Sequence, residues 1–276
     1  MSLTGAARQG SPGPGAHDPL FRVEEAPAFT RRHLARLAAG TAGAVQVDRF
    51  FGPAECEQAL ASIRSLPLQQ YDTARVPLSA YRFGPQLNEF RTAEGGLDTE
   101  AYWHAVEKAE RACADAGLAG DPVTPVLERL AAEWGIPLVR ATIDGRPVFG
   151  GAVRAIENGT LVHCDELVRE FPDGLFDQDV TAQLAFNLYA SAPERGGETV
   201  VWRRRWHPDD ESHRQDSGFK PSVVEGCQLI RFRPAVGTAL LFHPGNMHTV
   251  EPSHGPRVTF SLFLGLTVPG ELIYWS

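Results

Sequence analysis

Hydrophobic positions in the first half of the chain recur every three or four residues, the spacing of helices with one buried face. The pattern predicts helices over residues 53–65, 99–116 and 121–134. The last of these has the clearest ends, because Asp121 is suited to cap its N-terminus and Gly135 to stop it. The N-terminal half is therefore predicted to be largely helical.

After Gly135 the period changes from 3.6 to 2, as expected for strands whose side chains alternate between two faces. Strands are predicted over residues 137–143, 147–157, 181–190, 197–204, 228–233, 238–243 and 257–267, and a short one over 45–50 precedes the helices. Strands separated by turn residues are typical of an antiparallel sandwich or barrel. The pattern thus predicts a mixed α+β fold with a helical part over residues 28–136 and a β core over 137–276.

Three segments show no regular period. Residues 1–27 hold seven Gly or Pro in their first twenty positions, which predicts a flexible leader before a single domain over 28–276. The stretch 66–97 is longer than an ordinary connection, so it is either disordered or functional. Residues 202–219 are rich in charged and aromatic side chains, and we expect them to form a lid over a substrate.

Composition and charge exclude several classes of protein. The 276 residues include 34 acidic and 26 basic side chains, a formal net charge of -8, so no global positive field attracts a nucleic-acid backbone. No apolar run approaches the ~20 residues that span a bilayer, and the N-terminus lacks a basic-then-apolar export signal. The four cysteines form no close C-x-x-C pair, which excludes a disulfide framework and a zinc knuckle. We therefore expect a cytoplasmic protein without nucleic-acid or membrane partners.

Candidate metal ligands begin in the segment that contains His163 and Asp165. Side chains two positions apart in an extended chain point to the same face, so this imidazole and this carboxylate converge, whereas Cys164 points away. A second imidazole comes far downstream, from His248, which lies 83 residues after Asp165, or from its neighbour His243. Two histidines and one carboxylate on one face of a metal leave positions open, the arrangement used by non-haem Fe(II) oxygenases.

A second chemical feature is the predicted strand that begins at Arg257. Arg257 and Thr259 lie on its polar face, where an inward-facing guanidinium needs an anionic partner. A carboxylate can accept two parallel hydrogen bonds from an arginine and another from a threonine hydroxyl. The strand over 181–190 also has a polar face, with Asn187 and Tyr189, which we expect to contact a co-substrate. These residues indicate a site for a dicarboxylate.

Together these residues resemble the Fe(II)- and 2-oxoglutarate-dependent dioxygenases, particularly small-molecule members with a prolyl-hydroxylase-like pattern. The resemblance covers residues 147–268. It rests on the motifs His163-x-Asp165, Gly196-Gly197-Glu198-Thr199, Gly237-Thr238-Ala239-Leu240-Leu241-Phe242, His248 and Arg257-x-Thr259. It implies a double-stranded β-helix, also called a jelly roll, with the N-terminal helices buttressing one sheet.

The resemblance also implies roles for the site residues. His163, Asp165 and His248 would hold Fe(II), and His248 is favoured as the distal ligand because it lies nine residues before Arg257. Arg257 and Thr259 would bind the distal carboxylate of 2-oxoglutarate, with O2 as the other co-substrate. The resemblance implies no catalytic side chain beyond the metal ligands.

The activity implied by the resemblance is hydroxylation of an unactivated C–H bond in a small polar metabolite, an amino acid or a derivative of one. Related iron halogenases have a small residue in place of the carboxylate ligand, so Asp165 indicates an oxygenated product. Charged and aromatic residues near the site or in the irregular segments are the candidate substrate contacts: Glu166, Arg82, Arg91 and Trp206.

Two alternatives belong to other classes of protein. Histidine and aspartate ligands also suit zinc, so the same jelly roll could be a metal-dependent hydrolase or a small-molecule binding protein with a redox-inert metal. Arg257 separates these from an oxygenase, since a hydrolase needs no dicarboxylate anchor. Nucleic-acid demethylation, a third alternative within the oxygenases, is disfavoured by the net charge of -8.

Overall fold

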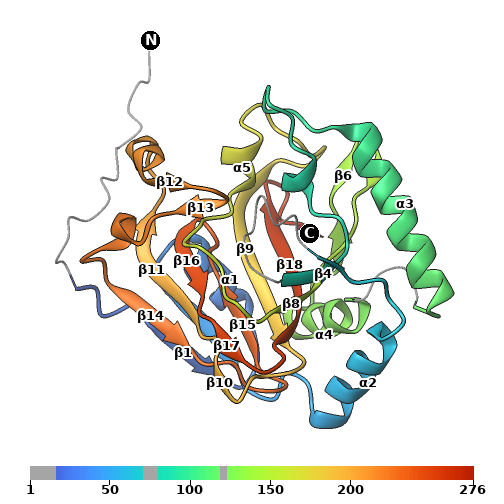
Figure 1. Cartoon of the computed structure of the whole chain (residues 1–276), viewed down its shortest axis with the longest axis horizontal. Helices are drawn as coiled ribbons and strands as arrows, with labels where there is room; N and C mark the ends of the chain where they lie inside the picture. The colour runs from blue at the N-terminus through green and yellow to red at the C-terminus, as the bar shows by residue number, and fades with distance from the viewer. Residues whose placement is uncertain (1–16, 71–79, 119–122) are drawn as a thin grey trace.

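The computed structural model describes residues 17–70, 80–118 and 123–276, and in these ranges two β-sheets are covered on one side by helices (Figure 1). The helices are α1 (Arg31–Ala38), α2 (Pro53–Ile63), α3 (Thr99–Asp115), α4 (Thr124–Trp134), the short α5 (Leu167–Glu170), and 3-10 turns at Leu87–Phe90, Pro208–His213 and Pro221–Val224. Within the described ranges, no helix has the length and apolarity needed to cross a membrane.

The strands form one large and one small sheet. The large sheet has the order β1 (Val23–Ala26), β2 (Ala44–Val47), β15 (Ala239–Phe242), β9 (Val180–Tyr189), β18 (Val258–Thr267), β8 (Ala152–Ile156), β4 (Ala80–Phe83) and β3 (Gln69–Gln70), while β19 (Leu272–Trp275) joins β18 to β5 (Leu138–Arg140). The small sheet has the order β14 (Leu229–Phe232), β11 (Thr199–Arg205) and β16 (Asn246–Val250). Three two-residue pairs complete the set: β6 (Thr142–Ile143) with β7 (Arg146–Pro147), β10 (Arg195–Gly196) with β17 (Ser253–His254), and β12 (Arg214–Gln215) with β13 (Gly218–Phe219).

The two sheets face each other across a small apolar cluster. Tyr189 and Leu240 project from the large sheet, Val201 and Phe232 project from the small one, and all four are buried. The rings of Tyr189 and Phe232 lie 5.0 Å apart, the contact distance of packed aromatic rings. This is the aligned sandwich packing in which residues of two inner faces interdigitate.

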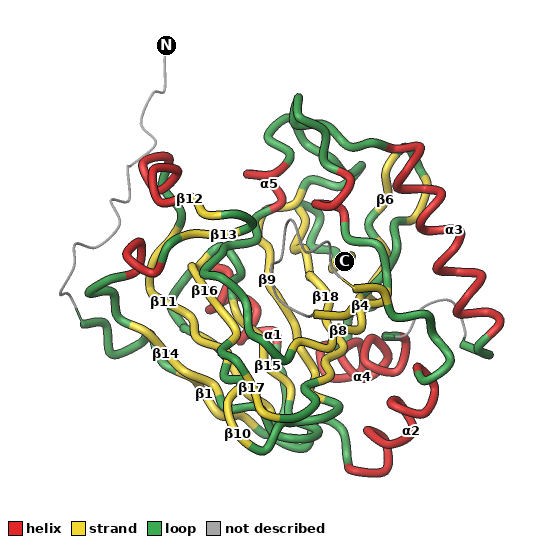
Figure 2. Tube along the Cα trace, in the orientation of Figure 1, coloured by secondary structure: helices red, strands yellow, loops and turns green. Residues whose placement is uncertain are grey.

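The other face of the large sheet packs against helices, of which α2, α3 and α4 lie on the side away from β14 and β11 (Figure 2). Phe186 of β9 and Phe260 of β18 belong to this larger core, together with Tyr102 of α3 and Trp134 of α4. These positions alternate along each strand with the inward-facing ones, because successive strand side chains point to opposite faces. The helices therefore support the sheet from outside and leave its inner face for the site.

The predicted fold class is confirmed: the chain is a mixed α+β jelly roll with buttressing N-terminal helices. The predicted helices over 53–65 and 99–116 agree with α2 and α3 to within two residues. Helix α4 begins at Thr124 after the cap residue Val123, and the expected cap Asp121 lies outside the described residues.

Two expectations for the N-terminal part need correction. The expected leader 1–27 includes β1, which pairs in parallel with β2, and residues 1–16 of it lie outside the described residues. The irregular stretch 66–97 contributes β3 and β4, and β4 extends the large sheet by pairing with β8. These strands have two to four residues each, too short for a period of 2 to be visible in the sequence.

Candidate metal centre and adjoining cavities

The backbone brings His163 and His248 directly opposite each other. The His163 N–H donates to the carbonyl of His248 at 2.9 Å, and the His248 N–H donates to the carbonyl of His163 at 2.8 Å. Residues paired in this way have side chains on the same side of an antiparallel ladder. Asp165 follows two positions after His163 in the same extended segment, and its N–H donates to the carbonyl of Pro244 at 3.0 Å, which holds this segment beside β16.

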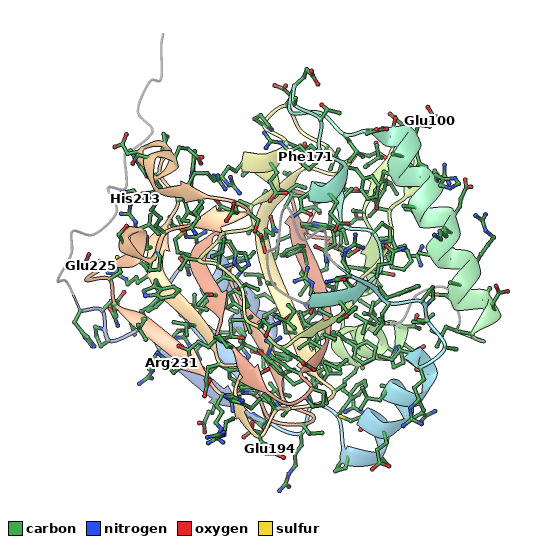
Figure 3. All side chains as sticks on the ribbon, viewed as in Figure 1. Glu100, Phe171, Glu194, His213, Glu225 and Arg231 are labelled. Carbon is green, nitrogen blue, oxygen red and sulfur yellow. The ribbon has the colours of Figure 1, made fainter. Side chains whose placement is uncertain are left out.

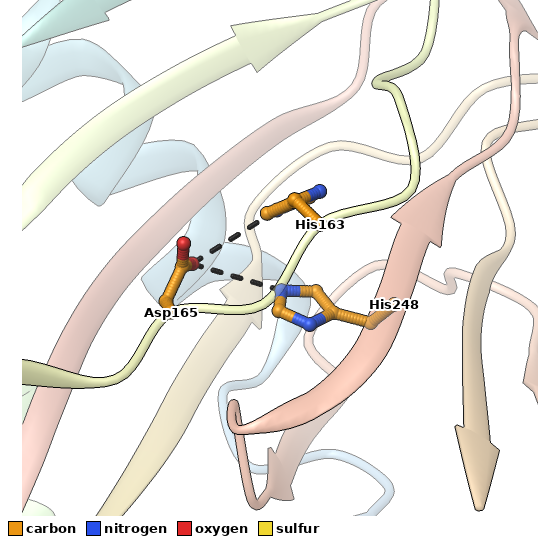
Figure 4. Close-up of side chains that lie close together, drawn as sticks. All are labelled: His163, Asp165 and His248. Carbon is orange, nitrogen blue, oxygen red and sulfur yellow. Dashed lines mark ion pairs between the residues drawn. The ribbon is translucent and has the colours of Figure 1, made fainter. Parts of the chain in front are cut away.

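The three side chains converge on one point, as Figure 4 shows. Asp165 Oδ2 lies 3.9 Å from His163 Nε2 and 3.7 Å from His248 Nε2. All three candidate ligand atoms lie within 4.8 Å of one another. These spacings are those of atoms that can share one metal ion at ligand distances of about 2 Å.

Hydrogen bonds set the tautomer of both imidazoles. His163 Nδ1–H donates to the carbonyl of Leu161 at 2.8 Å, and His248 Nδ1–H donates to the carbonyl of Asn246 at 2.8 Å. In each ring the Nε2 lone pair is therefore free to face Asp165. A backbone carbonyl on the second ring nitrogen is the usual support of a metal-ligating histidine.

Protonation states also suit a cation at this point. Burial, followed by the charge of His248, lowers the pKa of His163 to about 4, so its ring is neutral near pH 7. Burial by itself would raise the pKa of Asp165, but the two histidines beside it hold that pKa well below its usual range. Two imidazoles and one carboxylate are the donor set of the Fe(II) oxygenase triad, and the residues present fit such a metal.

One side of the triad is open. The side chains of His163 and Asp165 keep 25% and 22% of their surface exposed, whereas His248 keeps 7%. Both exposed residues line two cavities, of about 60 and about 170 Å³, that meet at the triad. Additional ligands and a substrate can therefore approach from this side.

The structure places His248, not His243, beside Asp165. The imidazole of His243 instead accepts hydrogen bonds at Nδ1 from Arg205, at 2.7 Å, and from the N–H of Gly245, at 3.1 Å. Burial and the positive charge of Arg205 lower the pKa of His243 to about 3. His243 is therefore a neutral residue that positions Arg205, and it is not one of the three residues whose ligand atoms converge.

Arg257 is a buried guanidinium at the far side of the smaller cavity. Its Nε donates to the carbonyl of Gly197 at 3.1 Å, and a terminal nitrogen donates to Thr199 Oγ1 at 3.3 Å and to the hydroxyl of Tyr189 at 3.5 Å. Gly197 has a φ of +75°, and a Cβ there would lie 3.1 Å from Arg257 Cδ, so a glycine is needed for this approach. Among the described residues, no carboxylate pairs with Arg257, which is 3% exposed.

The smaller cavity joins Arg257 to the triad. Besides these residues, it is lined by polar groups of the inner sheet face, among them Thr259, Ser261, Asn187, Thr199 and Arg154. The hydroxyl of Ser261 donates to Asn187 Oδ1 at 2.6 Å, and Tyr189 lies behind this wall with its hydroxyl 2.9 Å from Thr199 Oγ1. Of the four residues expected to contact a co-substrate, Arg257, Thr259 and Asn187 line the cavity, and Tyr189 reaches it through Arg257.

Of the candidate substrate residues, the structure places one beside the triad's larger cavity and the others away from it. Glu166 lines the larger cavity and pairs with Arg205 at 3.1 Å. Arg82 is directed elsewhere, to a separate cavity where it pairs with Glu89. Arg91 is exposed and forms a single β-bridge with Leu97, outside the residues that line the larger cavity.

Trp206 also lies outside the residues that line the larger cavity. Its indole N–H donates to Glu211 at 2.9 Å, and its ring packs against the guanidinium of Arg169. The expected lid, residues 202–219, consists of the end of β11, a 3-10 turn and the β12–β13 hairpin, and of these only Ser217 lines the larger cavity.

Glu170, at the end of α5, is a cavity residue that sequence reasoning missed. Its carboxylate lines the larger cavity and lies 3.8 Å from Arg169. Burial is the largest cause of a pKa raised to about 8, the charge of Asp165 adds to it, and Arg169 and Arg91 oppose it. The side chain is thus protonated over much of the range below pH 8.

We expect Glu170→Gln to stabilise the chain more at pH 8 than at pH 5. The pKa of Glu170 is near 4.5 in an unfolded chain and about 8 in the folded one, so only the folded state keeps this proton between those values. Stability from this group is therefore lost as the pH rises through that window, and glutamine removes the loss. Thermal unfolding should show a gain of about 2 °C or more at pH 8. An equal gain at both pH values would contradict the raised pKa.

Comparisons with known proteins complete the description of the site. Residues 163–276, which begin at the first candidate ligand, match the family described as carrier-protein-independent halogenase WelO5. The L-gamma-glutamyl-L-propargylglycine hydroxylase of Streptantibioticus cattleyicolor is 44% identical over 262 residues, 94% of this chain and 98% of that protein. The leucinostatins biosynthesis cluster protein S of Purpureocillium lilacinum is 34% identical over 156 residues, 51% of this chain and 63% of that protein.

Among solved structures, an N-substituted L-amino acid dioxygenase from Burkholderia ambifaria AMMD, in complex with alpha-KG, has a TM-score of 0.60. It is 16% identical, and the match covers 88% of this chain and 90% of that one. At this identity the likeness concerns the fold, and it extends over both the helical part and the β core.

Proposed function

Because the chain belongs to the Fe(II)- and 2-oxoglutarate-dependent dioxygenases, we propose that it hydroxylates an unactivated C–H bond of an amino acid or a small peptide derived from one. The observation that carries the proposal is the likeness to a γ-glutamyl amino-acid hydroxylase over nearly the full length of both chains. His163, Asp165 and His248 would hold the iron, since they present two imidazole Nε2 atoms and a carboxylate to one point.

Arg257 and Thr259 would bind the distal carboxylate of 2-oxoglutarate in the smaller cavity. This role supplies the anion that the buried guanidinium lacks, and it accounts for the cavity that joins Arg257 to the triad. When bound, iron with 2-oxoglutarate and O2 supplies the oxidising chemistry, in which 2-oxoglutarate becomes succinate and CO2 and the substrate gains a hydroxyl. A zinc hydrolase or a binding module would have no use for this anchor.

The larger cavity would hold the substrate beside the open side of the triad. Its volume of about 170 Å³ suits a molecule of amino-acid size, and its wall combines the apolar side chains of Phe263 and Trp275 with charged groups. The chain's contribution is positioning: polar groups fix the substrate's orientation, and the wall determines which C–H bond faces the triad.

The proposed function is tested by anaerobic titration of Fe(II) and 2-oxoglutarate, followed by O2 and mass spectrometry of the products. L-γ-glutamyl-L-propargylglycine is the first substrate probe, and pools of free amino acids and γ-glutamyl dipeptides are the second. We expect saturable 2-oxoglutarate binding that requires Fe(II), and a product heavier by one oxygen atom. Binding of Fe(II) without 2-oxoglutarate would contradict the oxygenase assignment.

Arg257→Ala is expected to weaken 2-oxoglutarate binding far more than it disturbs folding. Truncating one partner of a buried charge pair costs about 2–5 kcal/mol, which corresponds to roughly 30-fold or more in affinity. Calorimetry with Fe(II) present measures the affinity, and thermal unfolding checks the fold. Arg231→Ala is the matched control, because Arg231 lies at the outer edge of the molecule and pairs with Glu251 (Figure 3). Unchanged 2-oxoglutarate affinity in Arg257→Ala would remove the anchor role.

A further inference from the structure

Arg154 occupies the junction of the two cavities. It lies in the middle of β8, between Val153 and Ala155, and it lines both the smaller cavity and the larger one. In the sheet it is paired with Thr259 of β18, which also lines the smaller cavity. Paired residues have side chains on the same side of the sheet, so Arg154 is on the inner face.

The guanidinium of Arg154 has no protein partner in the described part of the chain. Its Nε is buried and forms no hydrogen bond. None of the three side-chain carboxylates that line the larger cavity, those of Asp165, Glu166 and Glu170, forms an ion pair with it.

This environment differs from that of the other arginines at the site. Arg205 pairs with Glu166, and Arg257 donates to three oxygen atoms of the protein. Arg154 is half-buried, but its Nε is buried without a hydrogen bond, which is costly. An inward arginine in this state points to an anion supplied from outside. The planar guanidinium is suited to bind a carboxylate through two parallel hydrogen bonds.

We propose that Arg154 binds a carboxylate of the substrate in the larger cavity and thereby selects carboxylate-bearing molecules. This inference rests on the proposed function, in which 2-oxoglutarate is anchored by Arg257 at the far side of the smaller cavity. That arrangement leaves Arg154 as the unpaired cation that faces the larger cavity.

The substrate of the S. cattleyicolor relative has the chemistry that Arg154 requires, and it serves as the probe. A γ-glutamyl dipeptide carries two carboxylates, one on each residue. The experiment measures, by anaerobic calorimetry with Fe(II) and 2-oxoglutarate present, the affinity of L-γ-glutamyl-L-propargylglycine and of its two monoamides, each lacking one carboxylate. The proteins are the unmodified chain, Arg154→Gln, Arg154→Lys and the surface control Arg231→Gln.

We expect Arg154→Gln to bind the dipeptide about 30-fold or more weakly, as for a truncated charge pair, and Arg154→Lys to recover part of the loss. One monoamide should bind the unmodified chain equally weakly, and the same monoamide should lose little further affinity in Arg154→Gln. Arg231→Gln and the affinity for 2-oxoglutarate should be unchanged. Should Arg154→Gln fail to fold, the monoamides on the unmodified chain and on Arg154→Lys still test the proposal.

Three outcomes would overturn the proposal. Equal dipeptide affinity in Arg154→Gln and the unmodified chain would remove the contact. If Arg154→Gln loses as much affinity for 2-oxoglutarate as for the dipeptide, Arg154 binds the co-substrate instead of the substrate. If the unmodified chain binds 2-oxoglutarate but not the dipeptide, the proposed selection of carboxylate-bearing substrates is wrong and the proposed function stands. If the unmodified chain binds neither ligand, the proposed function itself is contradicted.

Discussion

His163→Ala and His248→Ala are each expected to abolish iron-dependent turnover. Each variant removes one of the two imidazole nitrogens that face Asp165, and the remaining two ligands cannot hold the metal in a fixed position. Mutating an outer partner of a metal ligand typically costs 10–100-fold, so losing a ligand itself should cost about 100-fold or more. Metal content after desalting and succinate formation from 2-oxoglutarate measure the two effects.

His243→Ala is the matched control, because it removes a histidine only five positions from His248. The imidazole of His243 accepts a hydrogen bond from Arg205 and does not belong to the converging ligand group, so we expect this variant to retain bound iron. The opposite pattern, with metal lost from His243→Ala and kept by His248→Ala, would show that the distal ligand has been misassigned. Thermal unfolding of all three variants separates ligand loss from misfolding.

The sequence predicts well which residues lie on the inner face of the sheet, because side chains in a strand alternate strictly between its two faces. Thr259 and Ser261 line the smaller cavity, and Phe260 and Leu262 between and after them belong to the larger core, as the alternation predicts. The same rule places His163 beside Asp165 and turns Cys164 to the other side. Local geometry is sufficient for these positions.

Features that depend on distant contacts were beyond sequence reasoning. Strand β16, which contains His248, has no alternating pattern, since Asn246, Met247 and His248 are all buried, and its pairing with β11 is what makes it a strand. Arg154 stands out as a charge in an apolar strand, but its lack of a partner depends on segments distant in the sequence, such as β18 and residues 160–170. Glu170 belongs to a helix of four residues, which is too short for a helical period to appear.

The second large expected effect concerns the product. We expect the unmodified enzyme to form a hydroxylated product even with chloride in excess. Because residues 163–276 match a halogenase family, chlorination is the alternative outcome that must be tested. In this chain Asp165 is present, and its Oδ2 lies within 4 Å of both ligand nitrogens, so it would fill the coordination position that a halogenase leaves for chloride.

An 18O2 reaction with L-γ-glutamyl-L-propargylglycine in excess chloride decides between these outcomes. We expect one labelled oxygen atom in the product and no chlorine. Asp165→Gly should lose hydroxylation without gaining chlorination, because opening a coordination position does not by itself supply surroundings that stabilise the anion. A chlorinated product from the unmodified chain, or a desaturated product without the label, would contradict the hydroxylase assignment. Either result would leave the iron site itself intact, since metal content and 2-oxoglutarate binding are measured separately.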